Sequence, residues 1–304
     1  MGQPFQLQQD QAPSPLLFFL GEFSGETKNA IYDPLKKAFS VVDFPELSFQ
    51  IQCLASGQGW LLLLSRRTTS LFFFDPLTRR RIDLPYRSSV FNAATFSTAP
   101  TSPSCTVLAI ERDPYYGKFN FDVLRVGKEK SWTRHSYSVG SGVFGYVVNI
   151  VSCNGVFYCA DMQGRISSFD TKNWEYRVLS WKRFREAGGR FLVEHNGEIF
   201  AVKKGSNGIP EKVYKIKFGD DFIAHEAATW EEVKDLRDAT LFLGPHGACA
   251  CSGLDKDLQN TIFVAELGPQ SELVCSKFNE GVECMDVVKF DAREFSSLHA
   301  PVWI

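Results

Sequence analysis

The sequence lacks several features that would assign it to other classes of protein. Its longest apolar stretches, such as Trp60–Leu64, are far too short to span a bilayer. The N-terminus is rich in glutamine and has no cationic start before an apolar core, so we predict no signal peptide. Long helical periodicity is also missing, and the formal net charge of −2 supplies no positive field for nucleic acid. We therefore expect neither a membrane nor a nucleic acid as partner.

The cysteines do not form a recognisable disulfide or metal pattern. Eight cysteines would suggest disulfides in a short secreted chain, but this chain has 304 residues and no export signal. Reduced thiols in the cytoplasm or nucleus are the better interpretation. Cys249 and Cys251 alternate with alanine and so share one face of a strand. A metal site needs further ligands that the sequence does not place beside them, so we expect no metal and no cofactor.

One segment of the chain occurs twice. Ile31–Pro45 has the sequence IYDPLKKAFSVVDFP, and Phe73–Pro85 has the sequence FFDPLTRRRIDLP. The two Asp-Pro pairs, at Asp33 and Asp75, are 42 residues apart. Asp-Pro favours a tight turn, and the apolar residues on each side favour antiparallel strands. A unit of short strands that recurs every 40–45 residues or so is typical of a β-propeller blade.

Weaker copies of this unit occur along the rest of the chain. Taking the turns as markers gives an all-β fold with a single β-propeller of six four-stranded antiparallel blades, seven being the alternative. Residues 1–14 form a polar lead-in, and residues 15–304 form the propeller domain. Trp132, Trp174 and Trp230 recur late in their units, which suggests repeated packing roles. We expect the propeller to be a monomer.

The turns indicate which loops lie on each of the two faces of the propeller. Asn154-Gly155 and Asn196-Gly197 lie between apolar runs and predict hairpins that join the first and second strands of a blade. The Asp-Pro turns then join the third and fourth strands on the same face. The opposite face carries the second-to-third loops and the links between blades, several of which are basic and aromatic. We expect a protein partner to bind this loop face, although an ordinary solvated surface is the alternative. The candidate contact residues are Arg66, Arg67, Arg87, Tyr115, Tyr116, Trp181, Arg183 and Arg185.

Catalytic and nucleotide-binding motifs give weak signals. The segment 140–145 matches G-x-G-x-x-G, but a strand rather than a helix is predicted after it, so an inter-blade linker is the better interpretation. The five histidines are scattered singly, and no Gly-x-Ser-x-Gly elbow is present. The candidate innermost strands, Ala93–Phe96, Val147–Val151 and Phe191–Glu194, offer mainly apolar residues, with Glu194 the lone acid. We do not expect this chain to be an enzyme. A channel-site enzyme and an RNA-binding propeller remain alternatives.

Several of these motifs together resemble a known family. The run from Ala55 through the second Asp-Pro unit to Pro85 resembles the propeller domain of plant F-box proteins of the kelch-like type. Asn154–Tyr158 is similar to the middle blade of that domain, Arg190–Ile199 to a later one, and the terminal Pro301–Ile304 to its closing strand. The resemblance covers nearly the whole chain.

The resemblance implies substrate recognition for a cullin-type ubiquitin ligase, in which an N-terminal F-box docks the adaptor. Only about fifteen residues precede the first strand-like run, too few for a three-helix F-box. Phe44–Leu47 mimics the opening of an F-box, but it occupies a blade position in the repeat. We therefore expect either a substrate receptor that has lost its F-box from this sequence or an F-box-less scaffold.

Overall fold

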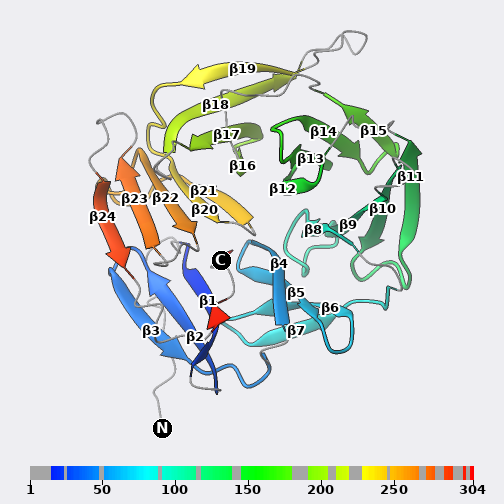
Figure 1. Cartoon of the computed structure of the whole chain (residues 1–304), viewed down its shortest axis with the longest axis horizontal. Helices are drawn as coiled ribbons and strands as arrows, with labels where there is room; N and C mark the ends of the chain where they lie inside the picture. The colour runs from blue at the N-terminus through cyan, green and yellow to red at the C-terminus, as the bar shows by residue number, and fades with distance from the viewer. Residues whose placement is uncertain are drawn as a thin grey trace.

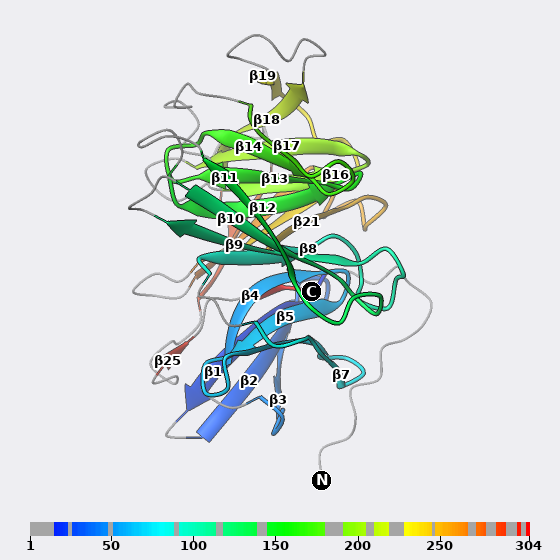
Figure 2. The same cartoon turned by 90° about the vertical axis from the view of Figure 1, so that its right-hand side faces the viewer.

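The computed structural model describes residues 15–23, 26–47, 51–87, 91–113, 118–138, 145–179, 191–204, 210–218, 228–244, 247–266, 272–277, 284–289, 297–298 and 302–304. All regular structure in these ranges is β-strand, arranged in six sheets. Among the described residues, no helix is long and apolar enough to cross a membrane. The sheets stand radially around a central axis as the six blades of a propeller (Figure 1), and the disc is seen from its edge in Figure 2. The predicted six-bladed all-β architecture is confirmed.

The strands follow the chain around the ring. Blade 1 contains β1 (Leu17–Phe23), β2 (Glu26–Asp33) and β3 (Ala38–Val42). Blade 2 contains β4 (Ile51–Gly57), β5 (Trp60–Ser65), β6 (Ser70–Asp75) and β7 (Arg80–Asp83). Blade 3 contains β8 (Ala93–Phe96), β9 (Thr106–Asp113), β10 (Lys118–Arg125) and β11 (Thr133–Ser138).

The second half of the chain supplies the other three blades. Blade 4 contains β12 (Val147–Cys153), β13 (Val156–Asp161), β14 (Ile166–Asp170) and β15 (Glu175–Val178). Blade 5 contains β16 (Phe191–His195), β17 (Glu198–Lys204), β18 (Pro210–Phe218) and β19 (Ala228–Val233). Blade 6 contains β20 (Thr240–Gly244), β21 (Gly247–Cys251), β22 (Thr261–Glu266), β23 (Glu272–Lys277) and β24 (Cys284–Lys289).

The two ends of the chain close the ring. β25 (Ser297–Leu298) and β26 (Val302–Trp303) both pair antiparallel with the inner edge of β1. Together they supply the innermost strand of blade 1, whose other strands come from the start of the chain. Trp303 is buried, and its Nε1 donates to the carbonyl of Leu243 in blade 6 at 3.0 Å. The closing strand that the resemblance implied at the C-terminus is therefore present.

The predicted turns form as expected. Asn154 and Gly155 both have positive φ, 53° and 84°, as the two-residue hairpin between β12 and β13 requires. In the first Asp-Pro turn, Asp33 Oδ1 accepts the N–H groups of Leu35 and Lys36 at 3.0 and 3.2 Å. Asp75 makes the equivalent bonds in blade 2. These aspartates therefore hold the turns between the third and fourth strands.

Two sheets depart from the expected four strands. Blade 1 gains β25 as well as β26 on its inner edge, and blade 6 has the order β21-β20-β22-β23-β24. In blade 6, β21 folds back inside β20, so that β20 and β22 pair in parallel. Small residues permit this placement, because a Cβ at Gly247 would lie 2.4 Å from Ser56 Oγ and 2.9 Å from the Ser56 carbonyl oxygen. β21 therefore reaches β4 across the inner ring.

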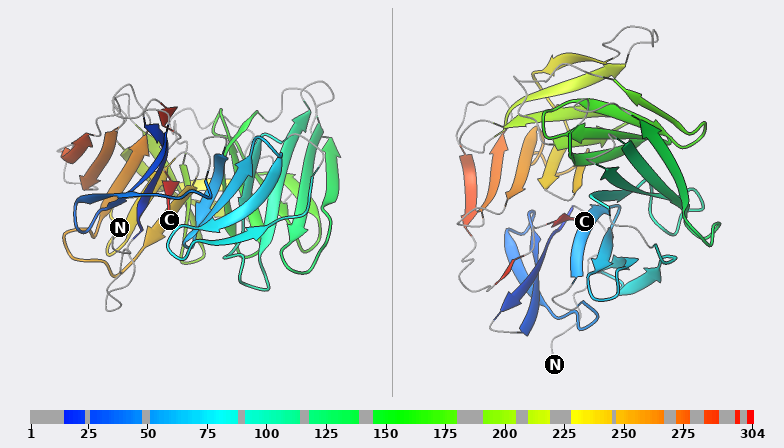
Figure 3. Two further views of the ribbon diagram at one scale, coloured as in Figure 1. Left: turned by 90° about the horizontal axis from the view of Figure 1, so that it is seen from below. Right: turned by 45° about the vertical axis from the view of Figure 1, so that its right-hand side comes forward.

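The hydrophobic core is divided among the interfaces between neighbouring blades and does not form one central cluster. Six clusters of buried apolar side chains each join one pair of neighbouring blades. Phe44 and Leu47, in the segment that mimics an F-box opening, are buried between blades 1 and 2. Trp132, Trp174 and Trp230 each pack against a different cluster, which confirms their repeated packing roles. The two views in Figure 3 show how the blades stack face to face around the ring.

Candidate functional site

Arg66 and Arg67 lie in the β5–β6 turn, on the face that carries the second-to-third loops. Both side chains are exposed. Arg66 donates from Nε and Nη2 to Oε1 of Gln52, at 3.3 and 3.1 Å. Gln52 belongs to the innermost strand β4 and lines the central cavity. Arg66 therefore lies beside the loop-face mouth of the channel, and its role as a contact residue stays a prediction.

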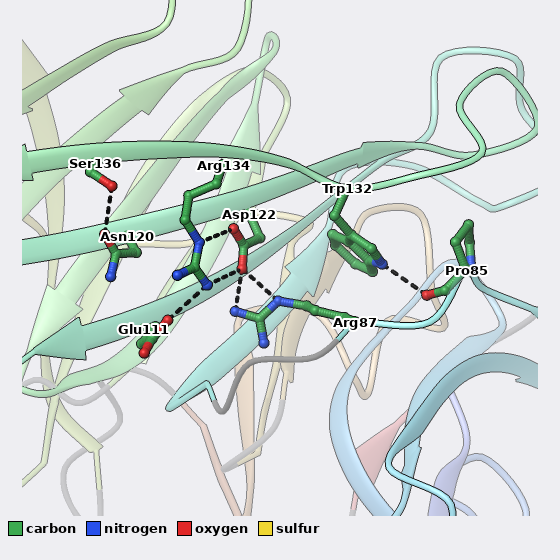
Figure 4. Close-up of polar contacts among 8 residues, drawn as sticks. All are labelled: Pro85, Arg87, Glu111, Asn120, Asp122, Trp132, Arg134 and Ser136. Atoms are coloured by element: carbon green, nitrogen blue, oxygen red, sulfur yellow. Dashed lines mark hydrogen bonds and ion pairs between the residues drawn. The ribbon is translucent and has the colours of Figure 1, made fainter.

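Arg87 is not on the exposed loop surface. It is 7% exposed, and its Nε donates to Asp122 Oδ2 at 2.6 Å. A second contact joins Nη2 of Arg87 to the same carboxylate. Arg134 approaches from the opposite side and donates from Nε to Asp122 Oδ1 at 2.8 Å (Figure 4). The prediction that Arg87 is presented to a partner is therefore wrong, because its guanidinium fastens the chain after blade 2 to blade 3.

This buried cluster is balanced in charge. Arg134 Nη2 also donates to Glu111 Oε2 at 2.8 Å, so two guanidinium groups face two carboxylates. Burial alone would raise the pKa of Asp122, but the hydrogen bonds from Arg134 and the charge of Arg87 lower it overall. The hydrogen bond to Asp122 raises the pKa of Arg134. Asp122 and Arg134 are therefore held in their charged forms, and removing the Asp122 carboxylate would take a buried counter-ion from Arg87.

The same segment presents an exposed tyrosine between two anchors. Trp132 Nε1 donates to the carbonyl of Pro85 at 2.9 Å, and Arg87 is held by Asp122. Tyr86, between them, is 71% exposed. The backbone on both sides is fixed while the ring projects into solvent, which makes Tyr86 a candidate contact residue.

Five predicted contact residues lie outside the described residues. They are Tyr115, Tyr116, Trp181, Arg183 and Arg185. Their assignment as contact residues stays a prediction.

Three of the exposed apolar side chains in the described ranges lie together on the loop face at blade 4. Tyr146 precedes β12, Val148 lies at its start, and Met162 lies in the β13–β14 loop. Their exposed fractions are 47%, 36% and 64%. The Met162 N–H donates to the Tyr146 carbonyl at 3.0 Å, which joins the two segments. We call these three residues the blade 4 platform.

A buried ion pair holds the loop that carries Met162. Asp161 is 1% exposed, and Arg165 donates to its Oδ2 from Nε at 2.7 Å. Asp161 Oδ1 accepts the N–H groups of Gln163 and Arg165, both at 2.9 Å. The Gly145 N–H donates to Oδ2 at 2.7 Å, which ties the entry of β12 to the same carboxylate. The platform is therefore pre-organised from beneath.

A β-bulge orients the third member of the platform. Val147 pairs with Asp161 and Asn149 pairs with Ala160, so Val148 is the extra residue. Bulges re-aim side chains at the edges of sheets. Val148 is 36% exposed and lies on the cavity wall, whereas Ile150 and Val151 of the same strand pack between blades. The strand after the G-x-G-x-x-G segment also confirms that this motif leads into β12 rather than into a helix.

A cavity of about 380 Å³ occupies the centre of the ring. The innermost strands of blades 2–6, namely β4, β8, β12, β16 and β21, line it. Figure 1 shows these strands around the centre of the ring. The predicted inner strands are confirmed, and Glu194 does lie on the channel wall. In the part of the chain that the structure describes, the rest of the wall is made of amides, hydroxyls, the Cys249 thiol and apolar side chains, of which Phe96 is the largest.

A serine and a histidine meet at the tight-turn end of the channel. His195 Nε2 lies 3.0 Å from Ser252 Oγ, and Asn196 Nδ2 lies 3.1 Å from the same nitrogen. Among the described residues no carboxylate is bonded to His195 Nδ1, so the third member of a catalytic triad is not assembled there. The groups of three or more ligand-type side chains that a metal site needs are likewise missing from the described residues.

The blade 4 platform was missed by inspection of the sequence. Neither Tyr146 nor Met162 belongs to a sequence motif that indicates a contact surface. The usable signal was Asp161 followed by Gly164-Arg165 at a strand-to-strand loop, because that spacing lets a carboxylate cap its own loop. The bulge at Val148 has no signal in the sequence.

The fold and its loop-face platform define a six-bladed β-propeller with an exposed apolar surface beside its channel. Residues 31–287 match the KIB1-4 beta-propeller family, and the chain belongs to that family. The resemblance to the propellers of F-box proteins is thereby confirmed.

Three relatives come from Arabidopsis thaliana. The F-box/kelch-repeat protein At3g18720 is 28% identical over 269 residues, which are 83% of this chain and 68% of that protein. The F-box protein At3g56470 is 31% identical over 270 residues, 82% of this chain and 70% of the relative. The F-box protein At1g49360 is 28% identical over 241 residues, 76% of this chain. This chain spans 48% of the length of that last relative.

Proposed function

We propose that this chain is a non-enzymatic protein-interaction propeller that recognises its partner through the loop face. Within that class, we propose that it serves as the substrate-recognition module of a cullin-type ubiquitin ligase, or as an F-box-less derivative that acts as a scaffold. The names of its relatives support the first role, since they are F-box proteins. The observation that carries the proposal is the blade 4 platform.

The platform has the chemistry of a protein contact surface. Tyrosine is enriched among residues that dominate binding energy, and methionine adapts its shape to a partner. The buried Asp161–Arg165 pair fixes the loop beneath, so little conformational entropy is lost when a partner binds. An exposed apolar group of this kind is buried only when a partner binds. It therefore contributes more to the stability of the complex than to the stability of the free propeller.

Other loop-face residues extend the proposed surface. Arg66 and Arg67 supply cations near the channel mouth, and Arg66 is already oriented by Gln52. We keep Tyr115, Tyr116, Trp181, Arg183 and Arg185 as proposed contacts on the same face. Arginine would form paired hydrogen bonds with carboxylates of the partner, and the rings would supply buried anchors. We also propose a monomer that works in the cytoplasm or nucleus, where thiols stay reduced.

The ligase role is tested by affinity purification of the tagged chain from its native extract, followed by mass spectrometry. Recovery of a cullin and its adaptor with wild-type chain supports a receptor role, and the remaining specific proteins are candidate substrates. A stable complex that contains neither would contradict the ligase role and leave the scaffold role. The RNA alternative predicts recovery that falls steeply as salt rises and after ribonuclease treatment.

A further inference from the structure

The central cavity adjoins the blade 4 platform at Val148, which also lies on the cavity wall. Its volume, about 380 Å³, lies at the small end of the range of ligand pockets. Five blades contribute to its wall, so that a bound group would contact segments from most of the ring. It is partly open to solvent.

The wall of the cavity carries one charged side chain among the described residues. That side chain is Glu194, near the end of β16. The polar wall residues around it carry amides or hydroxyls. They are Gln52, Ser56, Gln58, Asn92, Thr95, Ser97, Asn149 and Ser152. No lysine, arginine or histidine of the described chain lies on this wall, so the charge of Glu194 is not balanced within the cavity.

One oxygen of Glu194 is fixed by its own hairpin. The Gly197 N–H donates to Glu194 Oε1 at 2.8 Å. The other oxygen, Oε2, has no hydrogen bond to any residue in the described ranges. Burial raises the pKa of the nearby Cys153 thiol, and the negative charge of Glu194 raises it further. The carboxylate is therefore oriented while one acceptor oxygen is left for another donor.

Three wall amides already have their oxygens in use, and one of them is Gln52, whose Oε1 accepts from Arg66. Asn149 Oδ1 accepts the Leu192 N–H at 3.1 Å, and Gln58 Oε1 accepts the Ala99 N–H at 2.7 Å. The bond of Asn149 joins β12 to β16, and the bond of Gln58 joins the β4–β5 turn to blade 3. Both bonds fix the wall. Each innermost strand is also the edge of its sheet, and alternate carbonyl groups of an edge strand point away from its partner. The channel therefore offers carbonyl acceptors, together with the N–H donors that alternate with them along an edge strand, around a single carboxylate.

We propose that the central cavity binds a guanidinium or ammonium group on a slender aliphatic chain, with Glu194 as its counter-ion. Such a group supplies donors for Glu194 Oε2 and for the carbonyl acceptors of the wall, and its methylene chain suits the apolar positions between them. A charge-assisted hydrogen bond of this kind is about twice as strong as a neutral one. The proposal does not depend on the partner-binding role of the loop face.

The test compares two probes of nearly equal shape. Isothermal titration calorimetry of the full chain with n-butylguanidinium and with the uncharged n-butylurea separates charge from size. We expect n-butylguanidinium to bind at least about tenfold more tightly, which corresponds to one charge-assisted hydrogen bond. Equal binding of the two probes, or no binding of either at millimolar concentration, would overturn the proposal.

Two variants locate the binding. Glu194→Gln keeps an acceptor for the Gly197 N–H and removes the charge, and we expect it to lose the preference for n-butylguanidinium. Glu198→Gln is the matched control, because Glu198 is an exposed residue next to the same hairpin and pairs with Lys215 outside the cavity. Glu194→Gln with wild-type preference and an unchanged melting temperature would place the cation elsewhere and overturn the assignment.

A third probe identifies the source of the cation. N-acetyl-arginine-amide carries the same guanidinium on a polypeptide backbone. If it binds in a Glu194-dependent way, the cavity accepts an arginine side chain of a protein. If only n-butylguanidinium binds, the cavity is restricted to small free cations. Loss of partner capture by platform variants would leave both outcomes unchanged, so the two proposals can fail separately.

Discussion

Asp122 shows how much of this fold depends on contacts of single side chains that the sequence does not predict. Arg87 and its partner Asp122 are separated by 35 positions, and only the packing of blades 2 and 3 brings them together. From sequence, Tyr86-Arg87 is a basic and aromatic loop pair, which favours an exposed contact site. The structure divides the pair, since Tyr86 is exposed and Arg87 is buried.

Asp122→Asn is predicted to destabilise the propeller strongly. It would leave two guanidinium groups facing a neutral amide, and breaking a buried ion pair costs about 3–5 kcal/mol of unfolding free energy. Urea denaturation measures the change. Asp83→Asn is the matched control, because its pair with Arg81 is exposed and such pairs contribute about 0–1 kcal/mol. Equal effects of the two variants would contradict the role assigned to the buried cluster.

The stabilisation by Asp122 depends on pH in one direction. Its pKa is lower in the folded chain, so the folded state binds fewer protons there than the unfolded state. The contribution is complete above the unfolded pKa of about 3.9 and is lost as pH falls towards the folded pKa. The stability difference between wild type and Asp122→Asn should therefore shrink as the pH is lowered from about 5 to 3. A difference that grows over this range would contradict the lowered pKa.

At the scale of elements, turns were predictable and strand placement was not. Asn154-Gly155 and the Asp-Pro turns depend on local backbone preferences, which the sequence states directly. The bulge at Val148 and the inward fold of β21 depend on what lies across the sheet. The closing strand was recognised through resemblance, because two residues of strand carry almost no periodicity.

Trp303→Ala tests the closure of the ring. The indole is buried against Phe242 and Phe263, with ring centroids 4.8 and 6.0 Å away. Truncating a buried tryptophan costs about 3–5 kcal/mol, and the carbonyl of Leu243 also loses its donor. Val41→Ala, at a residue 75% exposed, is the control and should change stability by less than about 0.5 kcal/mol. If thermal unfolding of the two variants coincides, the C-terminal strand does not hold the ring closed.

At the scale of the whole molecule, the ring separates two surfaces with different chemistry. The loop face presents the blade 4 platform, which the buried Asp161–Arg165 pair supports. The channel holds one unbalanced carboxylate among the described residues. The sequence located Glu194 on an inner strand, but it did not locate the platform, which depends on the β13–β14 loop and on a bulge in β12. The repeat predicted the scaffold, and the scaffold determines where these residues lie.

The most direct test of the account is quantitative affinity capture with a platform variant. Tyr146→Ser with Met162→Asp should reduce recovery of the wild-type partners at least tenfold, as loss of about 2 kcal/mol at a hot spot predicts. Leu77→Asp is the matched control, since Leu77 is an exposed apolar residue in a tight turn of the opposite face. It should leave capture at the wild-type level, and all three proteins should melt at similar temperatures. Full capture by a folded platform variant would show that the partner binds elsewhere and contradict the central claim.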